Sequence, residues 1–394
     1  MGLDIVAIQQ ALGDDELDGW LLYDFHGSNP IARGLVGLDA SGALTTRRWY
    51  YLIPASGPPR GLVHAIERDR LDHLPGETAT YAGHGALTEG LERLLSGCHT
   101  VAMEYSPDCA IPYVSRVDAG TIDIIRAHGI EVRSSGDLIQ RFEAVWNEAA
   151  LETHLAAAKA LYQIKDNAFA LVQQRLESGT PVTEFEIQDA MWAWFEEAGL
   201  VSDSRPVVAA QENAGDPHYL PTPARHRSLG EDEILLLDLW GKLDRPGAVF
   251  ADITWMGYTG ATVPTRYASA FDVICDARDT AIDLVDRRVR EGRPLHGWEV
   301  DRAARERVAA AGLADYFVHR TGHSLGEEVH GNGVHLDDFE THDDRRLLTG
   351  SGVTVEPGVY FEDFGLRTEI NLFVESGGAR VTGARQTEIR PLAS

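Results

Sequence analysis

Histidine is concentrated in one short segment of the chain. The stretch HRTGHSLGEEVHG, residues 319–331, holds three histidines and two glutamates. Five of the chain's 15 histidines fall between His319 and His342. A neutral imidazole binds divalent metal ions, and it exchanges protons near neutral pH. The segment is therefore the first place to look for a neutral metal ligand.

Four carboxylates interrupt segments that otherwise have the apolar pattern of strands. Asp238 lies in ILLLDLW, Asp252 in VFADITW, Glu356 in VTVEPGVY and Glu369 in LRTEINLFV. Burying a charge is costly unless the charge is paired or bound to a metal. Because four carboxylates and one neutral histidine carry four negative charges, two divalent cations would balance the set.

The first two carboxylates are expected to face each other across a β-hairpin. If the hairpin turns at Arg245, Asp238 and Asp252 lie directly opposite, with side chains about 5 Å apart on one face. Two anions at that distance need a cation between them or a shared proton. A single acid of this kind is more often salt-bridged or at a strand edge, but the ordered set favours metal binding. Oxygen ligands with imidazole suit Mn²⁺, Co²⁺ or Zn²⁺ in a two-metal hydrolytic site.

The elements that would position these residues divide the chain into two parts. Residues 1–146 alternate strand-like runs (GWLLYDF, RWYYLIP, GLVHAI, TVAMEY) with helical runs (ALTEGLERLLSG, DAGTIDIIRAHG). This alternation predicts an α/β domain with a mostly parallel sheet. None of the strand-like runs is followed by the glycine pattern of a dinucleotide site.

Residues 147–394 are expected to form a second, α+β domain. A long Ala- and Leu-rich helix is predicted from Asn147 to Gly179, and Thr183 with Glu186 has the spacing of a capping box. Strand patterns then dominate, interrupted by two helices near 268–290 and 298–312. The pattern predicts a largely antiparallel sheet.

Composition limits the possible partners. The chain has 61 acidic and 35 basic residues, a net charge of −26, which argues against nucleic-acid binding. Three widely separated cysteines predict no disulfide framework and favour the cytoplasm. The N-terminus has no signal-peptide pattern, and no apolar run of 18 residues predicts a membrane span.

The order Asp, Asp, His, Glu, Glu resembles that of the M24 metallopeptidases, the pita-bread family of methionine aminopeptidases, Xaa-Pro aminopeptidases and prolidases. The stretches that carry it are LLLDLWG, FADITWMG, HRTGHSLGEEVHG, VTVEPGVYF and LRTEINLFV. The first 146 residues resemble a creatinase-type N-terminal domain, which favours the Xaa-Pro branch. The resemblance implies a C-terminal pita-bread domain with a curved, mainly antiparallel sheet flanked by helices. Ile370 departs from the family, which often has Asp directly after the second Glu.

The resemblance also assigns roles by position. The implied metal ligands are Asp238, Asp252, His323, Glu356 and Glu369. The implied catalytic residues are Glu356, as general base, with His218 and His330. The implied substrate-binding residues are His319, Tyr360 and Arg367, and Arg345 matches the position of a prolidase arginine that reads the substrate's C-terminal carboxylate.

The implied reaction is hydrolysis of the peptide bond before proline by two divalent ions, Mn²⁺ first, with Co²⁺ or Zn²⁺ as alternatives. The main prediction is an Xaa-Pro dipeptidase, a prolidase. The alternative is an Xaa-Pro aminopeptidase acting on longer peptides. A metal-free creatinase-like hydrolase and a non-catalytic binding protein fit less well, because all five ligand positions are present. The resemblance also implies a homodimer.

Overall fold

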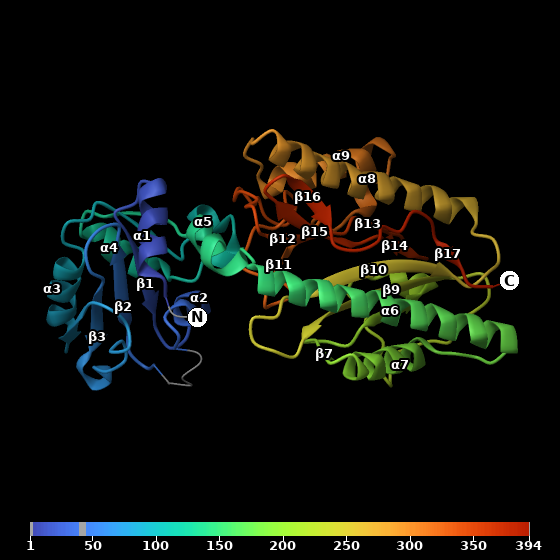
Figure 1. The fold of residues 1–394 in the computed structure, drawn as a ribbon, viewed down its shortest axis with the longest axis horizontal. Helices are drawn as coiled ribbons and strands as arrows, with labels where there is room; N and C mark the ends of the chain where they lie inside the picture. The colour runs from blue at the N-terminus through green and yellow to red at the C-terminus, as the bar shows by residue number, and fades with distance from the viewer. Residues whose placement is uncertain (1–2, 39–44, 394) are drawn as a thin grey trace. The chain divides into compact units, whose positions relative to one another are not determined.

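The computed structural model describes residues 3–38 and 45–393 of the chain (Figure 1). By its internal contacts the chain separates into two compact units, residues 1–142 and 143–394. The domain boundary between residues 146 and 147 stays a prediction.

The first unit is built on one six-stranded sheet, in the order β4-β3-β2-β1-β5-β6. Its strands are β1 Gly19–Asp24, β2 Trp49–Pro54, β3 Arg60–His64, β4 Glu77–Tyr81, β5 Thr100–Met103 and β6 Glu131–Ser134. Its α-helices are α1 Ile5–Asp14, α2 Pro30–Leu35, α3 His84–Leu94, α4 Ala119–Ala127 and α5 Gly136–Ile139. Three strand pairings are parallel, but β2 pairs antiparallel with both β1 and β3. The sheet is therefore mostly parallel, as predicted, with β2 as its one reversed strand.

Two helices open the second unit, and local signals set their ends. Helix α6, Glu148–Ser178, is capped by the side chain of Asn147 and ends at Gly179 in the left-handed conformation. Helix α7, Glu184–Glu197, begins with the predicted capping box of Thr183 and Glu186. Both helices share a buried apolar core with one face of strands β9, Ile234–Leu243, and β10, Ala251–Tyr258.

Strands β9 and β10 form the expected hairpin, but its register differs from the prediction by two residues. Asp252 pairs with Trp240, and Asp238 pairs with Thr254. Asp238 and Asp252 are therefore diagonal neighbours on one face rather than directly opposite each other. The hairpin shifts because Phe250 leaves it: the Phe250 N–H donates to the carbonyl of Gly326, at 3.0 Å.

Three short strands join this hairpin. Strand β7, Leu200–Val201, and strand β8, Val207–Ala210, both pair with the edge of β9, and β17, Arg390–Pro391, pairs with β10. The β10–β17 pairing is parallel, and the other pairings of this unit are antiparallel, in line with the prediction.

A second sheet carries the later half of the unit, in the order β11-β12-β15-β16. These strands are β11 Ser324–Leu325, β12 Gly352–Val355, β15 Ile370–Glu375 and β16 Gly378–Val381, with a separate pair β13 Gly358–Tyr360 and β14 Gly365–Arg367. Helices α8, Thr265–Arg290, and α9, Gly297–Ala310, cover it and form the second core of this unit (Figure 1). The two predicted helices are thus present.

The sequence pattern predicts Glu356 and Glu369 inside strands. In the structure both lie at strand ends. Glu356 directly follows β12 and precedes Pro357, which has no N–H to continue a ladder. Glu369 lies between β14 and β15, where its N–H donates to the carbonyl of Thr254. Both carboxylates therefore lie between two strands that pair with different neighbours.

Among the residues that the structure describes, no helix combines the length and the apolar character needed to cross a membrane.

Candidate metal centre

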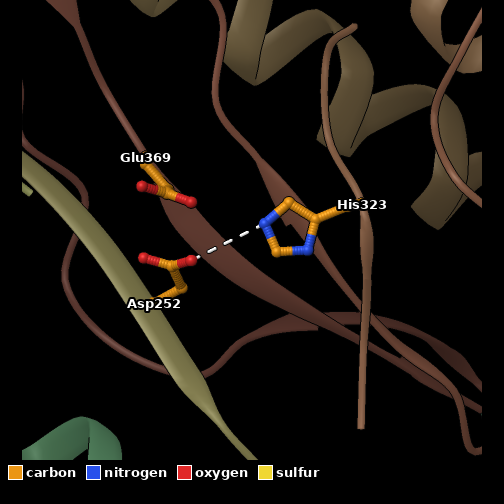
Figure 2. Close-up of side chains that lie close together, drawn as sticks. All are labelled: Asp252, His323 and Glu369. Atoms are coloured by element: carbon orange, nitrogen blue, oxygen red, sulfur yellow. Dashed lines mark ion pairs between the residues drawn. The ribbon is translucent and has the colours of Figure 1, made fainter. Parts of the chain in front are cut away.

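Three side chains from distant parts of the sequence converge in the second unit (Figure 2). Asp252 of β10, His323 before β11 and Glu369 before β15 each present a ligand atom, and these atoms lie within 4.8 Å of one another. All three side chains are buried. The His323 Nε2 atom is 3.6 Å from Asp252 Oδ2, which leaves space between them for a shared cation.

His323 is oriented to offer one nitrogen. Its Nδ1 lies 3.2 Å from the carbonyl oxygen of Ser324, which can only accept, so Nδ1 carries the proton and Nε2 keeps its lone pair. Burial lowers the pKa of His323 to about 4, so the ring is neutral at pH 7. A buried neutral imidazole with a free Nε2 lone pair suits a divalent metal ion.

Glu356 joins the same cluster from the end of β12. Its Oε1 lies 3.5 Å from His323 Nε2 and accepts a hydrogen bond of 3.1 Å from the Thr354 hydroxyl. The same hydroxyl accepts from the His323 backbone N–H at 2.9 Å. Thr354 therefore fixes His323 and Glu356 relative to each other. The Glu356 side chain is 14% exposed, against 4% for His323, so it is the more accessible to a substrate.

Arg367 connects Asp238 to the rest of the cluster. Its Nη2 forms an ion pair with Asp238, and its Nε donates to the Thr254 hydroxyl at 2.9 Å. Thr254 in turn donates to Glu369 Oε2 at 2.7 Å. Asp238 and Thr254 are direct cross-strand partners, so Arg367 reaches both. This buried arginine therefore holds Asp238 directly and Glu369 through Thr254.

The electrostatics of the cluster favour the binding of a cation. Burial raises the pKa of both Asp238 and Asp252 to about 7, against the opposing charge of Arg367. Burial also raises the pKa of Glu356 and of Glu369, and the neighbouring carboxylates add to the increase at both. Asp252 Oδ1 is buried without a hydrogen-bond partner. An orphaned carboxylate oxygen among raised carboxyl pKa values fits a divalent cation.

His319 and Tyr360 border the cluster on the Arg367 side. His319 Nδ1 lies 2.7 Å from the carbonyl of Arg320, so its Nε2 accepts from the Tyr360 hydroxyl at 2.8 Å. The same hydroxyl accepts from Arg367 Nη1 at 3.2 Å. Burial, assisted by the charge of Arg367, lowers the pKa of His319 to about 3 and keeps the ring neutral. His319 and Tyr360 therefore belong to the network around Asp238.

The two histidines expected to meet the substrate lie further out. The His330 ring stands perpendicular to that of His323, with centroids 4.4 Å apart, and its pKa is lowered to about 3, mainly by desolvation. His218 is exposed, in the loop after the 3₁₀ helix Gln211–Gly215. His218 also adds to the lowering of the His330 pKa, so the two rings are electrostatic neighbours.

The geometry of Arg345 disagrees with a role in reading the substrate carboxylate. The side chain is buried, and its Nε and Nη2 make a bidentate pair with Asp343 at 2.9 and 2.6 Å. Its Nη1 donates to the carbonyl of Asn332 at 2.8 Å. Because this guanidinium is committed to neighbours in its own loop, Arg345 holds that loop together.

Sequence reasoning missed three polar residues that support the centre. Thr254 and Thr354 make the contacts described above, and Asn371 clamps the backbone of Asp252 with two hydrogen bonds of 2.9 and 2.8 Å. Each lies two residues from a carboxylate, at 252/254, 354/356 and 369/371. In a strand, residues two apart share a face, so this spacing was a usable signal.

We expect Gly322→Ala to disrupt the centre. A Cβ at Gly322 would lie 2.0 Å from the backbone carbonyl oxygen of Thr354, so the His323 segment would have to move away from β12. We expect a loss of about 1–3 kcal/mol of unfolding free energy and a large loss of activity, measured by denaturant unfolding and peptide hydrolysis. Gly326→Ala is the control, since its Cβ would meet nothing closer than 3.9 Å. Equal behaviour of the two variants would contradict this placement of His323.

We also expect divalent metal to stabilise the protein more at pH 8 than at pH 5. The carboxyl pKa values of Asp238 and Asp252 are about 7, above those of an unfolded chain. Their contribution to the stability of the metal-free protein is complete below about pH 4 and is lost as the pH rises through 7. A bound cation offsets that loss. Thermal unfolding with and without Mn²⁺ at both pH values measures the difference, and an equal gain at both would contradict it.

The family model of metallopeptidase family M24 matches residues 156–381, more than half of the chain. The chain belongs to family M24. All of the residues in the cluster lie within the matched part. As an M24 protein, the chain is part of a family of metal-dependent peptidases, so a cation at the converging carboxylates is in keeping with its family.

Curated relatives match this M24 protein over part of their length. It is 28% identical over 259 residues to an uncharacterized peptidase of Staphylococcus haemolyticus, covering 64% of this chain and 66% of that protein. It is 27% identical over 244 residues to a probable dipeptidase PepE of Mycobacterium tuberculosis, covering 62% and 59%. The matches thus span about three fifths to two thirds of these relatives.

Solved structures share the fold over nearly the whole chain. The dipeptidase PepE of Mycobacterium ulcerans superposes with a TM-score of 0.70 at 22% identity, covering 99% of this chain and 97% of that one. The Xaa-Pro dipeptidase of Bacillus anthracis gives a TM-score of 0.60 at 19% identity, covering 98% and 99%. These likenesses establish the pita-bread architecture of this M24 protein.

Proposed function

We propose that this M24 protein hydrolyses the peptide bond before proline, as an Xaa-Pro dipeptidase with two divalent metal ions. The observation that carries the proposal is the convergence of Asp252, His323 and Glu369, together with the Asp252 Oδ1 atom that is buried without a hydrogen-bond partner. Asp238 and Glu356 complete a set of five ligands. Four carboxylates and a neutral imidazole carry four negative charges, which favours two divalent ions over one.

Mn²⁺ is the first choice of metal, with Co²⁺ or Zn²⁺ as alternatives, because the set is dominated by carboxylate oxygens. When bound, the ions supply a water of lowered pKa and polarise the scissile carbonyl. Asp252, Glu369 and His323 would hold the ions together with Asp238 and Glu356. Arg367 positions Asp238 for this role, and Thr354 positions Glu356.

Glu356 is the general base in this proposal. It accepts the proton of the attacking water and passes it to the departing proline nitrogen. Its partial exposure lets a substrate approach it, and its hydrogen bond from Thr354 holds one oxygen in place while the other is left for the proton.

His330 and His218 act on the substrate carbonyl in this proposal. Both would donate hydrogen bonds to the oxygen on which negative charge develops. His330 stays neutral because of its lowered pKa, so it donates as an imidazole rather than as a cation. Arg367 orients Asp238 through their ion pair, and His319 and Tyr360 hold Arg367 in place through the Tyr360 hydroxyl.

An Xaa-Pro aminopeptidase is the second candidate, and one observation favours it. A dipeptidase reads the C-terminal carboxylate of its substrate, whereas Arg345, the expected reader, is bound to Asp343 and Asn332. A longer peptide needs no such reader. A metal-free creatinase-like hydrolase and a non-catalytic protein would not require the five ligand positions. A homodimer and a cytoplasmic location stay predictions from the resemblance and the cysteine content.

The test compares Xaa-Pro dipeptides with Xaa-Pro-Yaa tripeptides, each with and without a chelator. We expect dipeptides to be hydrolysed and the chelator to stop the reaction. Efficient cleavage of tripeptides would move the assignment to an Xaa-Pro aminopeptidase. Cleavage of Xaa-Ala but not of Xaa-Pro peptides would overturn the specificity for proline, and activity that survives complete metal removal would overturn the mechanism.

A further inference from the structure

One exposed carboxylate beside the metal centre has no part in the proposed hydrolysis. Asp203 lies between β7 and β8, which pair with the same edge of β9, Val201 opposite Lys242 and Val207 opposite Asp238. The segment between the two short strands therefore passes the middle of β9 without pairing to it. This brings Asp203 to the part of β9 that carries the metal centre.

Trp240 fixes the carboxylate in place. The indole Nε1 of Trp240 donates to Asp203 Oδ1 at 2.6 Å. Trp240 is also the direct cross-strand partner of Asp252, so the two side chains project from the same face of the hairpin. Trp240 therefore links Asp203 to the strand position directly opposite Asp252.

The charge of Asp203 acts on the centre. It raises the pKa of Asp252, and it opposes the lowering of the pKa of His330. Its field thus reaches both a proposed metal ligand and a residue proposed to meet the substrate. Asp203 is exposed, and within residues 3–38 and 45–393 no Lys, Arg or His forms an ion pair with it. A fixed, accessible anion without a cation of its own can receive one from a ligand.

The substrate of an enzyme that cleaves after the first residue brings such a cation. The α-amine of a peptide has a pKa of about 7.7–8, so it is largely protonated at pH 7. An ammonium group donates strong, charge-assisted hydrogen bonds to a carboxylate. We propose that Asp203 binds the protonated α-amine of the peptide substrate and thereby selects peptides with a free N-terminus. This inference rests on the proposed peptidase function.

The variant Asp203→Asn tests the inference, because the amide oxygen can still accept from Trp240 while the charge is removed. The readouts are KM and kcat for the best Xaa-Pro peptide and the inhibition constant of the same peptide without its amine. We expect KM to rise about tenfold with kcat within twofold of wild type, since the amine contact is made equally in the ground and transition states. The inhibition constant of the des-amino peptide should not change.

Asp244→Asn is the matched control, because it removes an exposed negative charge from the turn of the β9–β10 hairpin and should leave both constants unchanged. An unchanged KM in Asp203→Asn overturns the inference. A rise of KM and of the des-amino inhibition constant by the same factor overturns it too, since that indicates a general change of the pocket. A fall in kcat accompanied by a fall in the amount of bound metal would assign Asp203 to the metal centre instead.

Failure of the proposed function is seen separately, in the wild-type protein. If wild type cleaves no Xaa-Pro peptide but does cleave another dipeptide, the proposed specificity for proline is wrong. Wild type and Asp203→Asn are then compared with that dipeptide and its des-amino analogue. If wild type cleaves no peptide with a free N-terminus, both the proposed function and the role of Asp203 are overturned.

Discussion

Replacing Glu356 with Gln is expected to lower kcat for Xaa-Pro hydrolysis by about 10³-fold while leaving the fold intact. The amide cannot accept the proton of the attacking water, and it is a weaker metal ligand. The fold should survive because Gln keeps the shape of the side chain and can still accept from the Thr354 hydroxyl. Steady-state kinetics at saturating Mn²⁺, with circular dichroism of the same samples, measures both effects.

Glu328→Gln is the control for this prediction. Glu328 belongs to the histidine-rich segment and is exposed, and the spacing of the ligand set gives it no role. Its replacement should leave kcat within about twofold of wild type. Near-normal turnover by Glu356→Gln would contradict the role of the general base.

Replacing Asp252 with Asn is expected to abolish metal binding and activity but to stabilise the metal-free protein. Asn cannot bridge two cations, so activity should fall at least about 10²-fold at micromolar Mn²⁺. The same change removes a buried carboxyl group whose pKa is raised to about 7. At pH 8 this group is ionised at a cost in the folded protein, and Asn carries no such charge. At pH 8 we expect the metal-free variant to gain about 2 kcal/mol in unfolding free energy.

Opposite signs for activity and stability make this variant informative. Metal content by mass spectrometry and denaturant unfolding of the chelated protein measure the two effects, with Asp244→Asn as the surface control. A variant that loses stability in the metal-free state at pH 8 would contradict the burial of Asp252 beside other negatively charged carboxylates. Retention of two metal equivalents would contradict its role as a bridging ligand.

Local signals in the sequence predicted the helices of the second unit well. The side chain of Asn147, the glycine at 179 and the pair Thr183 and Glu186 each act within one turn of their helix, so their effect does not depend on the rest of the fold. The carboxylates Asp252 and Glu369 and the imidazole of His323 also come together as predicted from their order along the chain. Their roles as ligands stay a proposal.

The parts that the sequence did not predict depend on distant contacts. The hairpin register was wrong by two residues because the chain after the turn bonds outside the hairpin, Val249 to Thr153 and Phe250 to Gly326. Counting residues outward from the turn predicts a register, but it gives no information about hydrogen bonds to distant residues such as Thr153 and Gly326. The commitment of Arg345 to Asp343 is a short-range pair, but its burial is set by the packing of the whole loop.

Titration of divalent metal into the chelated protein tests the central proposal most directly. Mn²⁺ is added in known equivalents while the release of free amino acid and proline from an Xaa-Pro dipeptide is measured, and bound metal is determined on the same samples. The chelated protein should be inactive, and activity should rise to a plateau at two bound equivalents per chain. Full activity in protein shown to hold no metal would contradict the proposal, as would a folded chain that binds no Mn²⁺ at pH 8.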